Sequence, residues 1–127
     1  MIEQQVGRRR KILIVDDQPT LARAIKRMLG EHDVTTVSNA RDALTRIEEG
    51  ERFDVILSDL MMPELSGMDL HAAITQIAPD QVEKMVFMTG GAFTGSAREF
   101  FEHVPNPTIE KPFDKAALLA LIEMFLR

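Results

Sequence analysis

Five polar residues in the sequence are of the right types for chemistry on a charged group, and they lie at the ends of short apolar runs. They are Asp16, Asp17, Asp59, Thr89 and Lys111. Three carboxylates at close range repel one another, so a cluster of them is costly to fold unless a cation lies among them. Oxygen-only ligands of high charge density suit Mg²⁺, with Mn²⁺ as an alternative. If the fold brings the three aspartates together, they indicate a Mg²⁺ site.

The lysine and the threonine extend this chemistry from metal binding to phosphoryl transfer. A divalent cation beside a free carboxylate, an ammonium group and a hydroxyl group is typical of a phosphoryl-transfer site. A carboxylate is the natural nucleophile there, and its attack on phosphorus gives an acyl phosphate. The cation and the lysine then neutralise the charge on the phosphoryl oxygens.

Each of these residues taken alone has a simpler explanation. Asp17 could cap a helix that begins at Pro19, and Asp59 could be a turn residue. Lys111 lies before a proline, as in many turns, and Thr89 precedes two glycines, as in a flexible loop. Taken together, the five residues indicate a functional site, because chance does not readily place all of them at one edge of a sheet.

The apolar pattern predicts the elements that position these residues. The run from Ile12 to Val15 is continuous and β-branched, which is typical of a strand buried on both faces. Between such runs, apolar residues recur at helical spacing, as at Leu21, Ile25 and Met28. The pattern predicts strands over residues 12–15, 34–37, 53–57, 82–88 and 107–109, and helices over residues 21–29, 40–47, 70–77, 97–104 and 114–126.

Strict alternation of strands and helices predicts an α/β fold with parallel strands and right-handed crossovers. We therefore expect a doubly wound, five-stranded parallel sheet with helices on both faces. Such folds place their sites in the crevice at the carboxyl ends of the strands. All of the polar residues named above follow strands, so they are expected to converge there.

Composition bounds the class of protein. The 127 residues suit one domain, which we expect over residues 11–127 after a flexible tail or linker over residues 1–10. There is no cysteine, which excludes disulfides, thiolate metal sites and cysteine nucleophiles. The net charge of -5 argues against binding to nucleic acid. No apolar run approaches the roughly 20 residues of a membrane span, so we expect no membrane contact and a cytoplasmic location.

At Asp16, Asp17, Asp59, Thr89 and Lys111 the sequence resembles the receiver domain of two-component response regulators, which has a flavodoxin-like fold. The resemblance covers Lys11 to Leu126 and rests on motifs that match in identity, order and placement. They are the run from Ile12 to Asp17, the segment from Ser58 to Pro63 with Gly67, the pair Thr89-Gly90, and Lys111-Pro112-Phe113. The resemblance implies that Asp59 is the phosphoacceptor. It also implies that Mg²⁺ is bound by the carboxylates of Asp16, Asp17 and Asp59 and by the backbone carbonyl of Met61.

The resemblance implies two further roles and a class of partner. Thr89 is the switch hydroxyl that moves to the phosphoryl group, and Lys111 pairs with the phosphorylated aspartate. The bond from Lys111 to Pro112 is expected to be cis, an isomer that only an X-Pro bond makes cheap. The phosphoryl group is expected to come from a phosphohistidine of a sensor histidine kinase or its phosphotransfer domain.

The chain departs from the family pattern at three positions. Thr108 stands three residues before the lysine, where the family usually has an aromatic residue that swings inward on activation. Met61 and Gly91 occupy positions that tune the lifetime of the phosphoryl group in the family. Neither residue has a polar side chain that could orient an attacking water, so slow self-dephosphorylation is expected. Whether the parent protein is an enzyme stays open.

The parent protein is expected to be a hybrid sensor histidine kinase with this receiver at its C-terminal end. That expectation rests on two segments, Met88 to Phe93 and Pro105-Asn106-Pro107, which most resemble the corresponding segments of such receivers. A stand-alone single-domain response regulator is the alternative. An aspartyl-phosphate phosphatase would share the chemistry, and a flavodoxin-like electron carrier would share the fold.

The last predicted helix is a candidate face for a partner or for self-association. Leu118, Leu121, Ile122 and Phe125 share one stripe, which we expect to face the core. Leu119 and Leu126 lie beside that stripe, and Met124 lies on its other flank. The chain's histidines, His32, His71 and His103, are expected to be solvated side chains.

Overall fold

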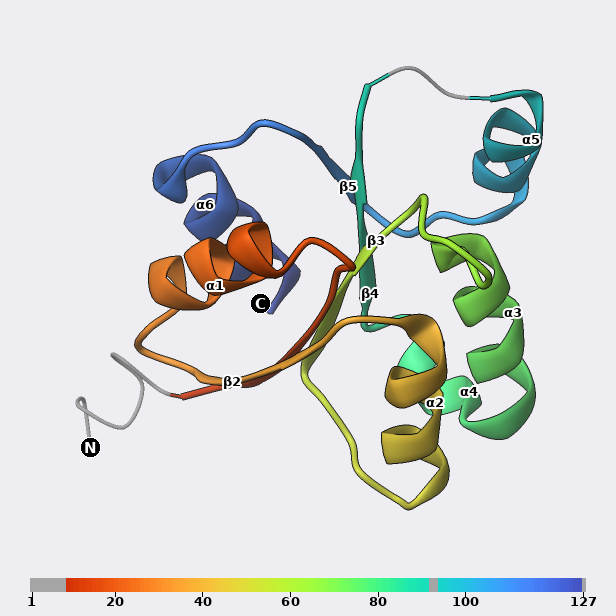
Figure 1. Cartoon of the computed structure of the whole chain (residues 1–127), viewed down its shortest axis with the longest axis horizontal. Coiled ribbons are helices and arrows are strands. Elements are labelled where there is room, and N and C mark those ends of the chain that lie inside the picture. The colour runs from red at the N-terminus through yellow and green to blue at the C-terminus, as the bar shows by residue number, and fades with distance from the viewer. Residues whose placement is uncertain (1–8, 92–93, 127) are drawn as a thin grey trace.

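The computed structural model describes residues 9–91 and 94–126 (Figure 1). The strands form one parallel sheet with the order β2-β1-β3-β4-β5. The strands are β1 (Lys11–Val15), β2 (Asp33–Val37), β3 (Val55–Asp59), β4 (Met85–Thr89) and β5 (Thr108–Glu110). The helices are α1 (Pro19–Met28), α2 (Ala40–Glu48), α3 (Gly67–Ile77), α4 (Pro79–Val82), α5 (Gly95–His103) and α6 (Lys115–Phe125). The predicted doubly wound parallel sheet is confirmed.

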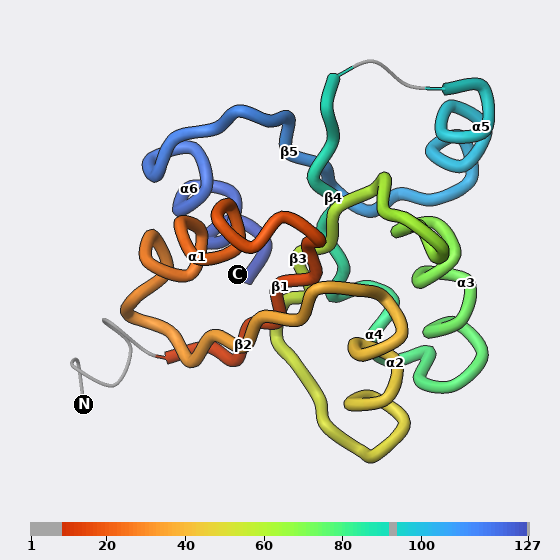
Figure 2. The backbone as a smooth tube through the Cα atoms, in the orientation of Figure 1, coloured from red at the N-terminus to blue at the C-terminus, as the bar shows by residue number. Residues whose placement is uncertain are grey.

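Helices cover both faces of the sheet (Figure 2). On one face, α1 and α6 pack on alternate strand residues such as Ile14 and Leu57. On the other face, α2, α3 and α5 pack on the intervening residues, such as Leu13 and Phe87. Because the central strands are buried on both faces, their apolar residues form continuous runs. The two apolar layers fix the strand ends that carry the polar residues.

Two strands differ from their predicted bounds by two residues or more, and the other three differ by one residue at most at either end. The predicted strand over residues 82–88 begins only at Met85, because Val82 closes the short helix α4, which Pro79 begins. The predicted strand over residues 53–57 runs instead from Val55 to Asp59, so Asp59 ends the strand and does not follow it. Phe53 lies outside the strand because the buried side chain of Gln81 binds both of its backbone groups, at 2.8 and 3.2 Å.

The start of α1 settles the alternative explanation of Asp17. The residue that caps α1 is Gln18, and no side chain makes a capping hydrogen bond there. The backbone N–H of Gln18 instead donates to Oδ1 of Asp16 at 2.9 Å. Asp17 is therefore not a helix cap, and that interpretation is wrong.

At the two ends of the domain, the structure differs in part from the predicted tail over residues 1–10 and from the predicted faces of the last helix. Of the expected tail, residues 1–8 lie outside the described residues. Arg10 is bound to the fold, since its N–H donates to Nδ1 of His32 at 3.1 Å and its C=O accepts from Asp33 at 2.9 Å. In α6, Leu119 and Leu126 are half-buried against the apolar layer that they were expected to lie beside. No helix in the described part of the chain is long and apolar enough to cross a membrane.

Candidate active site at the carboxyl ends of the strands

The three aspartates converge at the carboxyl ends of two neighbouring strands. Asp16 and Asp17 directly follow β1, and Asp59 ends β3, which pairs with β1. One carboxylate oxygen from each lies within 4.8 Å of the others. Asp16 and Asp59 are buried, whereas Asp17 is exposed. This geometry confirms the predicted cluster and leaves it open to solvent on the side of Asp17.

Lys111 reaches the same cluster from the other side. Its Nζ lies 3.2 Å from Oδ2 of Asp59 and 3.4 Å from Oδ2 of Asp16. The lysine directly follows β5, and its backbone N–H donates to the carbonyl of Thr89 at 2.7 Å. The bond between Lys111 and Pro112 is cis, as the resemblance implied.

The electrostatics of the cluster favour an added cation. Burial raises the pKa of Asp59 above its ordinary value, Lys111 lowers it, and the charges of Asp16 and Asp17 raise it. The net result is a raised pKa, so one ammonium group does not compensate for the three carboxylates and the burial. A divalent cation among the carboxylates would relieve the remaining repulsion. The donor set consists only of oxygens, which fits Mg²⁺.

The backbone around Asp59 is held by two small residues. The buried hydroxyl of Ser58 donates to the carbonyl of Asp59 at 3.0 Å. Gly67 begins α3 against the same carbonyl, and its N–H donates to the carbonyl of Leu60 at 2.8 Å. Gly67 belongs to the motif that the sequence analysis used, but Ser58 had no role assigned there. The available signal was a polar residue inside an apolar strand.

Thr89 and Met61 lie at this edge of the sheet with different exposure. Thr89 is buried at the end of β4, one residue beyond Met88, which pairs with Asp59. The side chain of Met61 is 56% exposed and offers only a thioether. The structure places both residues as the sequence predicts and leaves their roles as predictions. Thr108 is exposed at the start of β5, so no aromatic side chain stands at that position.

The loop after Thr89 is confined by β5. Gly91 has a φ of 96°, and a Cβ there would lie 2.8 Å from Oε2 of Glu110. A side chain at Gly91 would therefore be strained both by its backbone conformation and by its neighbour. Ala92 and Phe93, which contribute to the resemblance to hybrid kinases, lie outside the described residues.

Two histidines differ from expectation. His32 is half-buried and accepts the backbone N–H of Arg10 at 3.1 Å. His71 was expected to be solvated, but it is half-buried and packs edge-on against Phe100 at 5.2 Å between ring centroids. Burial lowers the pKa of His71, and a hydrogen bond with Asn106 opposes that shift. His71 therefore belongs to the packing between α3 and α5.

Comparison with known proteins agrees with this geometry. The sequence model of the response regulator receiver domain matches residues 12–123. The chain is 34% identical to the response regulator ArlR of Staphylococcus saprophyticus over 119 residues, 92% of this chain and 52% of ArlR. It is 30% identical to the response regulator receiver protein CpdR of Brucella abortus over 119 residues, 92% of this chain and 97% of CpdR.

A solved structure also aligns over most of the chain. It is the receiver domain of a sensor histidine kinase from Pseudomonas aeruginosa, described with a magnesium ion coordinated in its active site cleft. The TM-score is 0.78 at 28% identity, over 93% of this chain and 98% of that one. The chain spans about half of ArlR and smaller fractions of several longer relatives. With its fold, acidic cluster and lysine in place, the chain belongs to the response regulator receiver domain family.

Proposed function

We propose that this domain accepts a phosphoryl group on Asp59 from a phosphohistidine of a histidine kinase or its phosphotransfer domain. As a receiver domain, it is a phosphoacceptor of two-component signalling. The observation that carries the assignment to Asp59 is the contact of its Oδ2 with Nζ of Lys111 at 3.2 Å. Asp16 also contacts that lysine, but its carboxylate is fully buried and accepts a backbone N–H. Of the two carboxylates that Lys111 contacts, only that of Asp59 is accessible, with its side chain 11% exposed.

The chemistry follows from the charges around Asp59. An oxygen of its carboxylate attacks phosphorus, an O–P bond forms, and the P–N bond to the donor histidine breaks. Nζ of Lys111 neutralises charge on the phosphoryl oxygens. Mg²⁺, held by Asp16, Asp17, Asp59 and the backbone carbonyl of Met61, would supply the remaining neutralisation. The raised pKa of Asp59 is consistent with a site that needs this added cation.

The switch is proposed to depend on Thr89. Its hydroxyl moves to the phosphoryl group and draws the following loop inward. Thr108 cannot supply an aromatic signal, so the shift of α5 that follows is the main readout. This differs from receivers in which an aromatic residue at that position moves inward.

The parent protein is proposed to be a hybrid sensor histidine kinase. The aligned receiver of the Pseudomonas aeruginosa sensor histidine kinase supports this context. A stand-alone response regulator is the second candidate, since 97% of CpdR is covered by the alignment. A phosphatase is disfavoured because it would usually carry its nucleophile after the first strand, whereas Asp59 ends β3.

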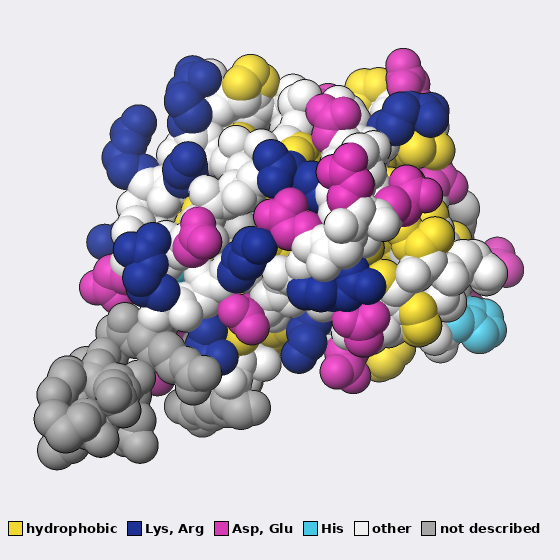
Figure 3. Space-filling model, turned by 90° about the horizontal axis from the view of Figure 1, so that it is seen from below, with side chains coloured by type: hydrophobic (Ala, Val, Ile, Leu, Met, Phe, Trp, Pro, Cys, Tyr) yellow, Lys and Arg dark blue, Asp and Glu magenta, His cyan; other side chains and the backbone are white. Residues whose placement is uncertain are grey.

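The partner surface is proposed to be protein and not nucleic acid. Lys and Arg side chains are interspersed with Asp and Glu across the middle of the face in Figure 3, so no broad basic surface forms there. Self-association is proposed through α6, where Met124 is 67% exposed and Ala116, Ala117 and Ala120 are also exposed. These residues form an apolar face that the rest of the described chain does not cover.

The test of the proposed function is labelling by a small phosphodonor. Acetyl phosphate with Mg²⁺ should add one phosphoryl group to Asp59, detected by intact mass and by peptide mapping. Asp59→Asn should abolish the label and keep the fold, as judged by circular dichroism. The matched control is Asp54→Asn, which changes a carboxylate at the opposite end of β3. Labelling that survives Asp59→Asn would assign the nucleophile to another residue.

A further inference from the structure

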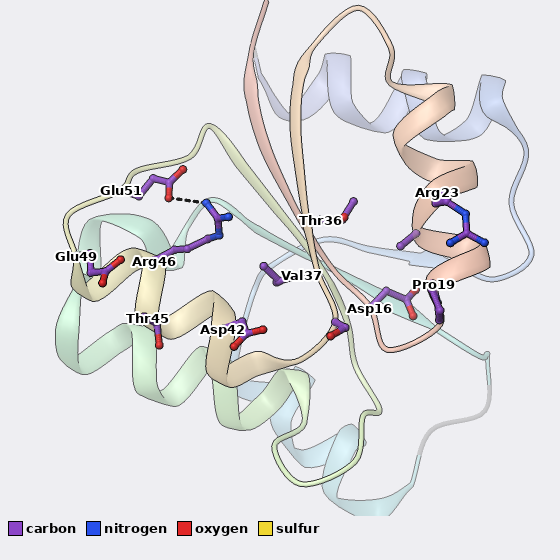
Figure 4. A pocket seen from close by; sticks show the side chains of 12 residues that line it. Asp16, Pro19, Arg23, Thr36, Val37, Asp42, Thr45, Arg46, Glu49 and Glu51 are labelled. Atoms are coloured by element: carbon purple, nitrogen blue, oxygen red, sulfur yellow. Dashed lines mark hydrogen bonds and ion pairs between the residues drawn. The ribbon is translucent and has the colours of Figure 1, made fainter.

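A cleft of about 660 Å³ lies along the open edge of the sheet, between α1 and α2 (Figure 4). Its floor includes Thr36 at the end of the edge strand β2. One wall is α1, which contributes Arg23, and the other wall is α2 with its C-terminal cap, which contribute Asp42 and Glu49. At one end the cleft reaches Asp16, a proposed Mg²⁺ ligand, but the phosphorylation chemistry proposed above uses none of Thr36, Arg23, Asp42 and Glu49.

The backbone groups on the open side of β2 have no hydrogen-bond partner among the residues that the structure describes. In β2, Asp33 donates its N–H at 2.9 Å to the residue that precedes β1, and Val37 accepts at 3.1 Å from the residue that follows β1. In a parallel ladder, alternate residues direct both backbone groups to the same side. The N–H and C=O of Val34 and Thr36 therefore point to the open edge. An extended chain laid along that edge would pair with them.

The shape of the cleft selects an extended peptide over a second folded domain. The edge strand carries no proline and no lysine, which are residues that proteins use to protect open edges. Its last two residues, Thr36 and Val37, lie on the floor of the cleft, and α1 and α2 stand on either side of them. A second copy of this chain has the same flanking helices, so it cannot bring its own β2 within hydrogen-bonding distance. A single extended segment can enter.

Charges on the two walls have opposite signs. On α2, Arg46 is paired with Glu51 at 3.0 Å, so Asp42 and Glu49 leave that wall acidic. On α1, Arg23 makes no ion pair with any residue that the structure describes. Successive side chains of a strand point to opposite faces. A strand that enters the cleft would therefore direct alternate side chains to an acidic wall and to a basic wall.

We propose that the cleft between α1 and α2 binds an extended peptide segment that adds to β2 and alternates basic and acidic residues. Basic side chains face α2, and acidic side chains face Arg23. Asp42 and Glu49 are about 10.5 Å apart along the helix axis. Basic residues at every second position of a strand are about 6.8 Å apart, and the flexible stem of lysine covers the difference. A small anion is disfavoured, because the acidic residues of the cleft outnumber the basic ones.

The probe is a synthetic twelve-residue peptide of alternating Glu and Lys. Its matched control has the same composition in the order Glu-Glu-Lys-Lys, which places both charges on each face of a strand. Binding is measured by two-dimensional NMR with the intact chain. The alternating peptide should bind at least about tenfold more tightly than the control and shift the amide signals of Val34 and Thr36. Methylating the backbone nitrogens of the peptide should abolish binding, since the added strand then loses its donors.

Charge reversal on each wall makes the test specific. Glu49→Lys should weaken the alternating peptide about tenfold, whereas Glu48→Lys, outside the cleft on the same helix, should not. Arg23→Glu should weaken it as well and should favour a peptide of alternating Lys and Thr. Arg27→Glu, one turn along α1, is the matched control for that wall. None of these changes should alter labelling by acetyl phosphate, so this test is independent of the proposed phosphoacceptor.

Three results would overturn the proposal. They are equal binding of the two peptides, no loss of affinity in Glu49→Lys, and no shift at Val34 and Thr36 in the presence of 1 mM peptide, roughly the weakest affinity that such an interface is expected to have. Sedimentation of the chain alone tests the other occupant. A dimer that Arg23→Glu disrupts would assign the cleft to a second copy of this chain.

Discussion

Gly67 and the backbone carbonyl of Asp59 lie so close that a Cβ atom on Gly67 would be 2.5 Å from the carbonyl oxygen. The first residue of α3 thus packs directly on the residue that we propose to be phosphorylated. Any side chain at Gly67 must displace the end of β3 or the start of α3. The position of the nucleophile therefore depends on the absence of a side chain eight residues further along the chain.

This contact predicts that Gly67→Ala lowers stability by about 1–3 kcal/mol, the usual cost of forcing atoms into a packed site. Chemical denaturation measures the loss, and labelling by acetyl phosphate should slow in the same variant. Gly95→Ala is a matched control, because Gly95 also begins a helix and a Cβ there meets nothing within 4 Å. That control should be neutral or stabilising by up to about 1 kcal/mol. Equal stability of the two variants would contradict the argument.

Binding of Mg²⁺ should stabilise the fold, because a divalent cation relieves the repulsion among Asp16, Asp17 and Asp59. At about ten times its Kd, a ligand that binds only the folded state contributes roughly 1.4 kcal/mol. Thermal melts with and without several millimolar Mg²⁺ measure this shift. Asp17→Asn should reduce the shift, whereas Glu48→Gln on the exposed face of α2 should not. A melting temperature that is the same with and without Mg²⁺ would count against the site.

Lys111→Ala should slow labelling of Asp59 by roughly a hundredfold, the cost of losing one charged group that stabilises the transferring phosphoryl oxygens. It should also raise the pKa of Asp59 further, since Lys111 lowers it in the folded protein. The rate is measured by phosphate incorporation from acetyl phosphate over time. Lys115→Ala, four residues on and exposed, is the control and should label at the normal rate.

Much of this site could be predicted because each strand can be recognised from residues that are close together in the sequence. Each strand is a short apolar run that ends in its polar residue, so the order of elements alone brings Asp16, Asp59 and Lys111 to one edge. The predicted end of that strand, at Leu57, was wrong by two residues, because Asp59 is the last residue of β3. The strand continues through Asp59 because both of its neighbours pair with adjacent strands, Ser58 with β1 and Leu60 with β4.

Features that depend on distant residues could not be predicted in this way. At Phe53 the side chain of Gln81, 28 residues away, makes the backbone hydrogen bonds that a neighbouring strand would otherwise make. Nothing in the local sequence pattern indicates that pairing. His71 lies on the partly polar surface of a predicted helix, but Phe87 and Phe100 from two other elements surround it. Leu119 was placed beside the core-facing stripe because an isolated helix does not show what packs on its flank.

His71 should make stability fall below neutral pH. Burial lowers its pKa in the folded chain below the value of 6.5 for an unperturbed histidine. As pH falls through 6.5, the unfolded chain binds a proton that the folded chain does not, so the free energy of unfolding decreases. The decrease ends once the pH is below the pKa in the folded state. Denaturation at pH 8 and pH 5 should show this contribution, and His71→Phe should remove it while keeping the ring contact with Phe100.

The face of α6 yields the last prediction. Met124 is 67% exposed, whereas Leu119 and Leu126 are half-buried against the core. A charge at Met124 therefore tests association without disturbing the fold, whereas Leu119→Glu with Leu126→Glu also lowers stability. If α6 forms the self-association face, Met124→Glu should weaken the dimer of the phosphorylated chain about tenfold by sedimentation, since one exposed apolar side chain of this size contributes about 1–2 kcal/mol when buried.

The matched control for that variant is Ile77→Glu, which places the same charge on an exposed apolar residue of α3, where Ile77 is 40% exposed. It should leave association unchanged, because α3 lies on the other face of the sheet from α6. Both variants should label normally at Asp59, which separates loss of the interface from loss of the active site. A dimer that survives Met124→Glu, or that Ile77→Glu disrupts equally, would show that α6 is not the interface.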